Sequence, residues 1–173
     1  MTDNGSPRRV VVVGNSGAGK SRLSTALANR FGLPLVHLDP HYWRPGWVKP
    51  STEEWRQQVA ELVARDEWVI DGNYASTFDL RLPRADLVVW VDPHRLICEY
   101  QALRRWWTGR NKQRVDLAEG CEEAIDWEFL VYIWNYRRGP AVRLERALAE
   151  HAPDTPVVRL TSRRAAHGWL GSV

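Results

Sequence analysis

A glycine-rich stretch near the N-terminus constrains this chain more than any other feature. Residues 14–21 read GNSGAGKS and fit the pattern G-x-x-x-x-G-K-S. Glycine lets a backbone turn tightly and approach an anion closely. The N–H groups freed in such a turn can point at phosphate oxygens from the start of the following helix. The pattern has this meaning only where a strand precedes it and a helix follows it.

The flanking residues supply that context. Residues 9–13, RVVVV, are typical of a buried parallel strand. Leu23, Leu27 and Phe31 recur at the spacing of one helical face, and Gly32 stands where a helix C-cap is expected. A chance glycine-rich turn would not explain these flanks. The sequence therefore predicts a phosphate-binding loop, with contacts from Gly14, Ser16, Gly17, Ala18, Gly19, Lys20, Ser21 and Arg22.

Two side chains of this loop have predicted chemical roles. Lys20 is expected to reach the β- and γ-phosphates of a nucleotide and to be catalytic. The Ser21 hydroxyl is expected to ligate Mg²⁺.

Composition limits the class of protein. The chain has 173 residues, of which 44% are hydrophobic and 26% charged, so we expect one soluble globular domain over residues 1–173. No apolar run approaches a membrane span, and the polar N-terminus lacks a signal-peptide core, so we expect a cytoplasmic protein without a membrane partner. Cys98 and Cys121 show no metal-site spacing, so a structural role is expected for both.

The positive charge is concentrated in one part of the chain. The formal net charge is +3 and the sequence pI about 9.1. Much of the excess comes from a basic stretch: Arg104, Arg105, Arg110, Lys112, Arg114, Arg137, Arg138, Arg143 and Arg146. This stretch could contact nucleic acid, or it could hold a polyphosphate ligand.

Strand-like and helix-like segments alternate along the rest of the chain. Ser51 and Glu54 match a capping box that opens an amphipathic helix. Such alternation predicts βαβ units and a parallel sheet covered by helices on both faces, an α/β three-layer sandwich. The further expected strands are 35–38, 68–70, 87–91 and 157–160, with a short closing helix over 165–170.

Three expected strands end in an acidic residue at the edge where such sheets bind ligands. Asp92 is a candidate to hold Mg²⁺, directly or through water, although a helix N-cap explains it equally well. Asp39 precedes Pro40, so we expect it outside any helix. We predict it to be a catalytic base or Mg²⁺ organiser rather than a turn-forming residue.

The third acidic strand end opens the segment Asp71-Gly72-Asn73-Tyr74. Its glycine permits a close backbone approach, and its polar side chains suit a bound substrate; a plain tight turn is the alternative. Asp39, His41 and Trp43 are expected to line the other side of the same acceptor pocket.

The basic stretch also predicts a catalytic device. Residues 108–120 lose helical periodicity and are rich in Arg, Lys and Gly, and we expect a short lid-like excursion over residues 104–120. Arg104, Arg105 and Arg137 are predicted to stabilise the charge of a transferring phosphoryl group. A solvated basic face is the alternative for any one of them.

Four segments together resemble a known family. They are GNSGAGKS, HLDPHYWRPGW, WVIDGNY and RLPRADLVVWVD. The combination resembles the P-loop nucleotide kinases of the "DNA topology modulation protein" (FlaR-type) group, which are similar to adenylate kinases. The resemblance implies strand order 2-3-1-4-5, ATP with Mg²⁺, and a lid. It also implies that the loop at 160–164 lies near the adenine, which makes Ser162 and Arg163 candidate ATP contacts.

We therefore predict an ATP- and Mg²⁺-dependent kinase of a small molecule, either a nucleoside monophosphate or a hydroxyl compound. The alternative is a nucleotide-dependent nucleic-acid-binding protein with slow ATP hydrolysis. The sequence leaves the acceptor and the oligomeric state open.

Overall fold

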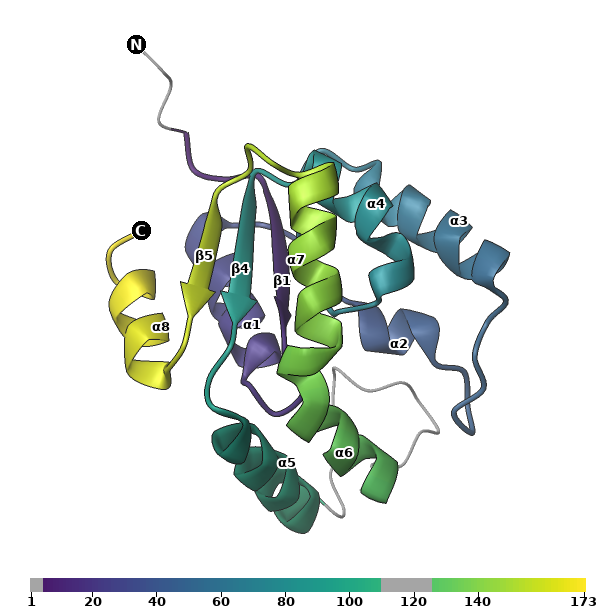
Figure 1. The fold of residues 1–173 in the computed structure, drawn as a ribbon. Helices are drawn as coiled ribbons and strands as arrows, with labels where there is room; N and C mark the ends of the chain where they lie inside the picture. The colour runs from purple at the N-terminus through teal and green to yellow at the C-terminus, as the bar shows by residue number, and fades with distance from the viewer. Residues whose placement is uncertain (1–4, 110–125) are drawn as a thin grey trace.

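The structure is a computed structural model that describes residues 5–109 and 126–173. Its centre is a five-stranded, all-parallel sheet with the order β2-β3-β1-β4-β5 (Figure 1). The strands are β1 (Arg9–Gly14), β2 (Leu35–His37), β3 (Trp68–Asp71), β4 (Leu87–Val91) and β5 (Val157–Leu160). The predicted α/β architecture and strand order are confirmed.

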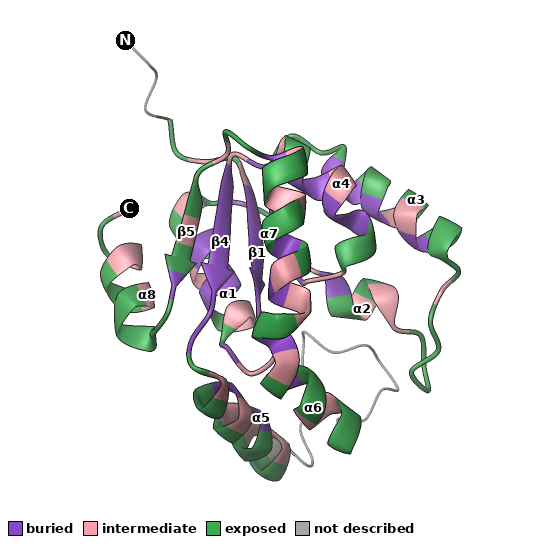
Figure 2. Cartoon of the chain, viewed as in Figure 1, coloured by how far each residue is buried: buried purple, intermediate pink, exposed green. Residues whose placement is uncertain are grey.

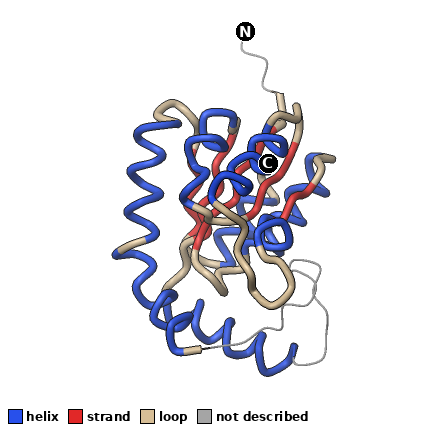
Figure 3. The backbone as a smooth tube through the Cα atoms, turned by 90° about the vertical axis from the view of Figure 1, so that its right-hand side faces the viewer, coloured by secondary structure: helices blue, strands red, loops and turns tan. Residues whose placement is uncertain are grey.

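Helices surround this sheet in the tube view, where the strands lie between helical layers (Figure 3). Within residues 5–109 and 126–173, three short 3₁₀ segments interrupt the connections: η1 (Ala75–Thr77), η2 (Leu82–Arg84) and η3 (Tyr136–Arg138). The α-helices are α1 (Lys20–Phe31), α2 (Leu38–Tyr42), α3 (Thr52–Val63), α4 (Phe78–Arg81), α5 (Arg95–Gly109), α6 (Trp127–Asn135), α7 (Pro140–His151) and α8 (Arg163–Leu170). None of the described helices is long and apolar enough to cross a membrane.

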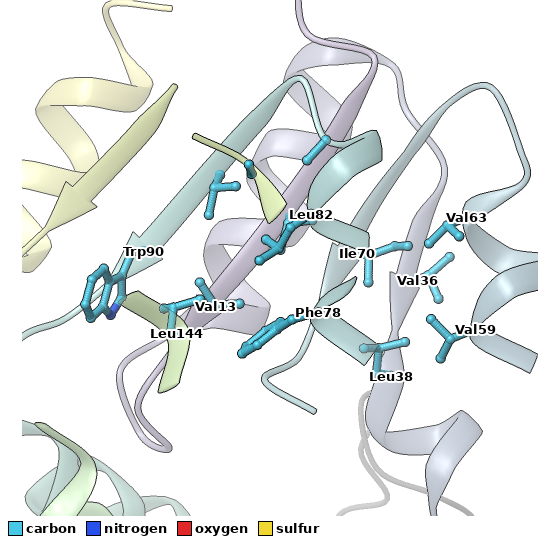
Figure 4. Close-up of a cluster of buried hydrophobic side chains, with 14 of the residues drawn as sticks. Val13, Val36, Leu38, Val59, Val63, Ile70, Phe78, Leu82, Trp90 and Leu144 are labelled. Carbon is cyan, nitrogen blue, oxygen red and sulfur yellow. The ribbon is translucent and has the colours of Figure 1, made fainter. Parts of the chain in front are cut away.

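Side chains that alternate along the strands build two hydrophobic cores, one on each face of the sheet. Val11 and Val13 belong to the core under α3, α4 and α7 (Figure 4). Val10 and Val12 belong to the core under α1 and α5. All four valines are fully buried, as the colouring of β1 shows (Figure 2). This is why β1 reads as an uninterrupted apolar run and holds the centre of the sheet.

Two boundary predictions were wrong. Asp39 lies inside a helix, in the first turn of α2. Pro40 does not prevent this, because N–H groups of a first turn have no partner within the helix anyway. Residues 104–109 are the end of α5 rather than part of a loop. The rest of the predicted lid, with Arg110, Lys112, Arg114 and also Cys121, lies outside the described residues.

At other positions the local sequence pattern predicted the helix ends correctly. The capping box at Ser51 is confirmed, with both reciprocal hydrogen bonds present. Gly32 is the αL C-cap of α1, as expected. Cys98 is buried in α5, and burial raises the pKa of its thiol to about 11, which suits a structural role.

Candidate active site

The glycine-rich loop connects the end of β1 to the start of α1, as predicted. Gly14, Gly17 and Gly19 all have positive φ angles, of 147°, 73° and 94°. A Cβ on Gly14 would lie 2.1 Å from the carbonyl oxygen of Val91, and one on Gly17 would lie 2.2 Å from that of Cys98. The backbone therefore passes so close to β4 and α5 that side chains are sterically excluded at both positions.

The loop ends at the N-terminus of a 12-residue helix. Lys20 and Ser21 occupy the first turn of α1, and the Lys20 Nζ atom donates a hydrogen bond to the carbonyl oxygen of Asn15, at 3.1 Å. This bond folds the lysine side chain back over the loop. No side chain caps the helix, because Gly19 is its N-cap. The first N–H groups of α1 therefore remain suited to an anionic ligand.

Asn73 fixes the start of the loop from the neighbouring strand. The Gly14 N–H donates to its Oδ1 atom at 3.0 Å, and its Nδ2 atom donates to the Gly14 carbonyl oxygen at 2.8 Å. The Nδ2 atom also donates to the Tyr132 hydroxyl of α6, at 3.1 Å. Asn73 was predicted as a substrate contact. The structure places it as a clamp that ties together β1, the loop after β3, and α6.

Arg81 shapes the loop after β3 and was not found in the sequence. Its side chain is fully buried. The guanidinium donates to the carbonyl oxygens of Gly72 (2.9 Å), Asn73 (2.5 Å) and Tyr74 (3.1 Å), and to the Thr77 hydroxyl (3.2 Å). Burial lowers the pKa of Arg81 to about 9, so the group is still charged at neutral pH. Only its position within the segment RLPR could have drawn attention to it.

Asp71 is the last residue of β3 and points inward. It is 5% exposed, and its Oδ2 atom lies 3.0 Å from the Nδ1 atom of His37, its neighbour on β2. The next residue, Gly72, has a φ of 146°, and a Cβ there would lie 2.9 Å from the Leu38 Cβ. In this arrangement Asp71 lies against His37 of β2, and Gly72 lies against Leu38 at the start of α2. A substrate contact by this segment stays a prediction.

Asp39 is exposed, and its orientation is set by Tyr74. The Tyr74 hydroxyl donates to the Asp39 Oδ1 atom at 2.6 Å. Burial and the nearby Asp39 carboxylate raise the pKa of Tyr74, so its hydroxyl remains a donor. The Tyr74 ring packs against Tyr42 and Trp55, with centroids 4.6 and 5.0 Å away. The structure thus brings Asp39 and Tyr74, both predicted as site residues, into contact beside the aromatic rings of Tyr42 and Trp55.

His41 and Trp43 lie on the same side of the site, within and just after α2. The His41 Nδ1 atom is 3.4 Å from the Gln58 Nε2 atom. Burial, followed by the positive charge of Arg65, lowers the pKa of His41. Trp43 packs edge-on against Trp47, with centroids 5.1 Å apart. Both residues therefore contact neighbouring side chains on this side of the site.

Asp92 is buried and held by two arginines. It is 1% exposed at the end of β4. The Arg137 Nε atom donates to its Oδ1 atom at 3.2 Å, and the Arg159 Nη2 atom donates to its Oδ2 atom at 2.6 Å. The Arg159 guanidinium also stacks over Trp90, 4.1 Å from the ring centroid. The predicted metal ligand Asp92 and the predicted catalytic Arg137 are thus partners of each other, and Arg159 was missed.

The remaining predicted site residues lie around α5. Arg104 is exposed and Arg105 half-buried on this helix. The Arg163 Nη2 atom donates to the Gln101 Oε1 atom at 2.5 Å, which joins α8 to α5. The Ser162 hydroxyl caps α8 by accepting from the Ala165 N–H. The Ser162 hydroxyl therefore has a structural role in the fold.

An open hollow of about 440 Å³ adjoins this site. Tyr132, the hydrogen-bond partner of Asn73, is part of its lining. Burial raises the pKa of the Tyr132 hydroxyl, and the hydrogen bond with Asn73 opposes this shift. The full lining is Glu128, Val131, Tyr132, Asn135, Arg138, Gly139, Pro140 and Arg143. The hollow is thus lined by two arginines and one glutamate.

These residues fit a nucleotide phosphate. The loop offers positive-φ glycines, the uncapped start of a long helix, and an adjacent lysine and serine. Among the described residues, no three His, Cys, Asp or Glu side chains gather as a metal cluster. A Mg²⁺ ion bound by one serine hydroxyl and by phosphate oxygens does not require such a cluster.

Comparisons with known proteins agree with this fold. A gluconokinase from Sinorhizobium meliloti 1021 superposes with a TM-score of 0.55 at 19% identity, covering 96% of this chain and 93% of that chain. Shikimate kinase from Bacteroides thetaiotaomicron gives 0.52 at 18% identity, covering 96% of both chains. Deoxyadenosine kinase from M. mycoides gives 0.51 at 11% identity, covering 95% and 97%. The chain has the fold of the P-loop kinases.

Sequence comparison adds one relative. The uncharacterized protein YqaC of Bacillus subtilis (strain 168) is 29% identical over 150 residues, which span 83% of this chain and 81% of YqaC. No protein-family model matches the chain. Membership of the FlaR-type group stays a prediction.

Proposed function

We propose that this protein is a kinase that transfers a phosphoryl group from Mg²⁺-ATP to a hydroxyl or phosphate group of a small, anionic acceptor. The observation that carries the proposal is the exposed Asp39 carboxylate. It accepts a hydrogen bond from Tyr74 at the edge of the sheet where the phosphate-binding loop also leaves β1. A protein that only bound nucleotides would not require an acceptor base. Three structural neighbours, a shikimate kinase, a deoxyadenosine kinase and a gluconokinase, support this class of reaction.

The loop and α1 would hold the nucleotide phosphates. The backbone N–H groups from Gly17 to Ser21 would bind phosphate oxygens, and the Ser21 hydroxyl would bind Mg²⁺. Lys20 would exchange its bond to Asn15 for one to a phosphate oxygen. Bound Mg²⁺-ATP supplies the phosphoryl group and partly neutralises its charge. Asn73 would keep the start of the loop in place during transfer.

Asp39 would act as the base for the acceptor. It would accept the proton of the acceptor hydroxyl as the new O–P bond forms and the bond to the ADP oxygen breaks. The hydrogen bond from Tyr74 fixes the carboxylate in one orientation, which favours the correct approach of the acceptor. Arg105, which is half-buried on α5, would supply positive charge to the transferring group.

The hollow beside Tyr132 indicates the class of acceptor. Arg138 and Arg143 contribute two positive charges to its lining, against one negative charge from Glu128. Arginine is well suited to bind carboxylate or phosphate, because its planar fork matches both. We therefore infer an acceptor with one hydroxyl directed to Asp39 and an anionic group directed to this hollow. Nucleoside monophosphates and sugar acids both meet this description.

The proposal can be tested by measuring ADP formation from Mg²⁺-ATP with a panel of acceptors, followed by mass spectrometry of the product. The panel would contain nucleoside monophosphates, hydroxy acids and uncharged hydroxyl compounds. We expect turnover with an anionic acceptor. Asp39→Asn should lower kcat about 100-fold or more while leaving ATP affinity nearly unchanged, and Lys20→Ala should abolish transfer.

The exposed Asp66, which lies outside the site, offers a control, and Asp66→Asn should retain full activity. Wild-type rates in Asp39→Asn would show that Asp39 is structural. The alternative drawn from the sequence, nucleic-acid binding, requires oligonucleotide affinity that falls steeply with salt concentration. We expect no such affinity.

A further inference from the structure

Helix α5 presents an apolar stripe to solvent. Leu96, Tyr100, Leu103 and Trp107 are 55%, 64%, 43% and 71% exposed. Their spacing of four, three and four residues places them on one side of the helix, in the pattern of the contact positions of a coiled coil. An exposed stripe of large apolar side chains with this periodicity is typical of a surface that packs against another helix.

The opposite side of α5 is buried and packs against the rest of the protein. Cys98 and Ala102 are fully buried there and belong to the core beneath the sheet. The backbone at these residues also passes so close to Gly17 that a Cβ on that glycine would collide with it. The inner side of the helix thus supports the phosphate-binding loop, while its outer side carries the apolar stripe. Figure 2 shows exposed residues along α5, below the sheet.

The charges beside the stripe indicate what covers it. In heptad terms Tyr100 and Trp107 occupy a positions, and Leu96 and Leu103 occupy d positions. Glu99 then falls at a g position, and Arg104 falls at the next e position, five residues later. In a parallel helix pair, a g residue of one chain meets the following e residue of the other. Two copies of α5 would therefore form two Glu99–Arg104 ion pairs, one on each side of the seam.

We propose that two copies of this chain associate through the outer side of α5, as a parallel, two-fold symmetric helix pair. The stripe is self-complementary, as a two-fold interface requires. An antiparallel pair would place each flank against the same flank of its partner and would form no such ion pairs. Because the seam covers only about four helical turns, we expect a dissociation constant of micromolar order. Association would also restrict the motion of α5, which contacts the phosphate-binding loop.

Sedimentation velocity of the full chain between about 1 and 200 µM tests the proposal. We expect a monomer–dimer equilibrium within this range. Tyr100→Lys should shift it at least tenfold toward monomer, because the substitution places two ammonium groups in the seam. Val48→Lys, at an exposed apolar residue away from α5, should leave it unchanged. Thermal melts would show that both variants are folded.

A charge exchange tests the parallel register itself. Glu99→Arg should weaken the dimer about tenfold, because both ion pairs become like-charge contacts. The double variant Glu99→Arg with Arg104→Glu restores both pairs in reverse and should recover most of the lost affinity. A double variant no tighter than the single one would refute the parallel seam. A monomer at every concentration, as expected if another segment of the same chain or a nucleic acid covers the stripe, would overturn the proposal.

Discussion

The buried Arg81 offers a sharp test of how the candidate site is built. Replacing it with Met keeps an unbranched side chain of similar length but removes every hydrogen-bond donor. The guanidinium donates to the carbonyl oxygens of Gly72, Asn73 and Tyr74 and to the hydroxyl of Thr77. The variant would therefore leave several polar groups without their partner at the turn that positions Asn73 and Tyr74.

The size of the effect follows from two opposing contributions. Each hydrogen bond from a charged donor contributes about 1.5–3 kcal/mol, so four of them contribute roughly 6–12 kcal/mol. Burying one guanidinium costs several kcal/mol, and the Met variant no longer bears that cost. We expect Arg81→Met to lower the free energy of unfolding by about 4 kcal/mol, which in a chain of this size lowers Tm by roughly 8–16 °C.

Urea unfolding followed by circular dichroism would measure this loss. Arg146→Met, at an exposed residue of α7, is the matched control and should change stability by less than about 0.5 kcal/mol. Because the loss is local to the turn, ATP affinity should also fall, measured by calorimetry at a temperature where the variant is folded. A loss of stability below about 1 kcal/mol would refute the reasoning, since the four hydrogen bonds would then barely exceed the cost of burying the charge.

Three further predictions follow from other contacts. Gly17→Ala should weaken ATP binding at least tenfold in calorimetry, because the new Cβ would collide with the α5 backbone at a positive φ; unchanged affinity would mean that the loop has room to move. Asn73→Ala removes both bonds to Gly14 and should raise KM for ATP about tenfold with a smaller change in kcat; a change confined to kcat would argue against a clamp. The Arg56 hydrogen bond lowers the pKa of Asp79 below 3.8. This pair therefore stabilises the fold above that pH and loses its effect as the pH falls further. Asp79→Asn should flatten the pH dependence of the urea midpoint below about pH 4.5, and an unaltered slope would contradict the assignment.

The sequence predicted the parts of this molecule that depend on neighbouring residues. A valine run, a glycine loop and a helical stripe follow one another within residues 9–31, so local patterns suffice to predict β1, the phosphate-binding loop and α1. The order of the strands was given by the resemblance to a known family, because no local pattern reveals which strands lie side by side. On the acceptor side, the acidic strand ends and the residues after them predicted Asp39 and Tyr74 as site residues, and the two side chains do contact each other.

The contacts that escaped prediction join residues far apart in the chain. Arg159 lies 67 positions from its partner Asp92, and Asn73 lies 59 positions from Gly14. Arg81 stands fewer than ten residues from its acceptors, but three of the four are backbone carbonyl oxygens, which leave no mark in the sequence. A sequence shows which side chains carry charge. The fold determines which of those charges are buried and therefore need a partner.

The three acidic strand ends show how burial separates residues that look equivalent in sequence. A carboxylate removed from water must be compensated by hydrogen bonds or opposite charge. Asp71 is buried against His37, and Asp92 is buried between Arg137 and Arg159, so both carboxylates are committed to the protein interior. Asp39 is exposed, and the Tyr74 hydroxyl orients its carboxylate. This difference in burial supports our proposal that Asp39, rather than Asp71 or Asp92, takes the proton from a bound acceptor.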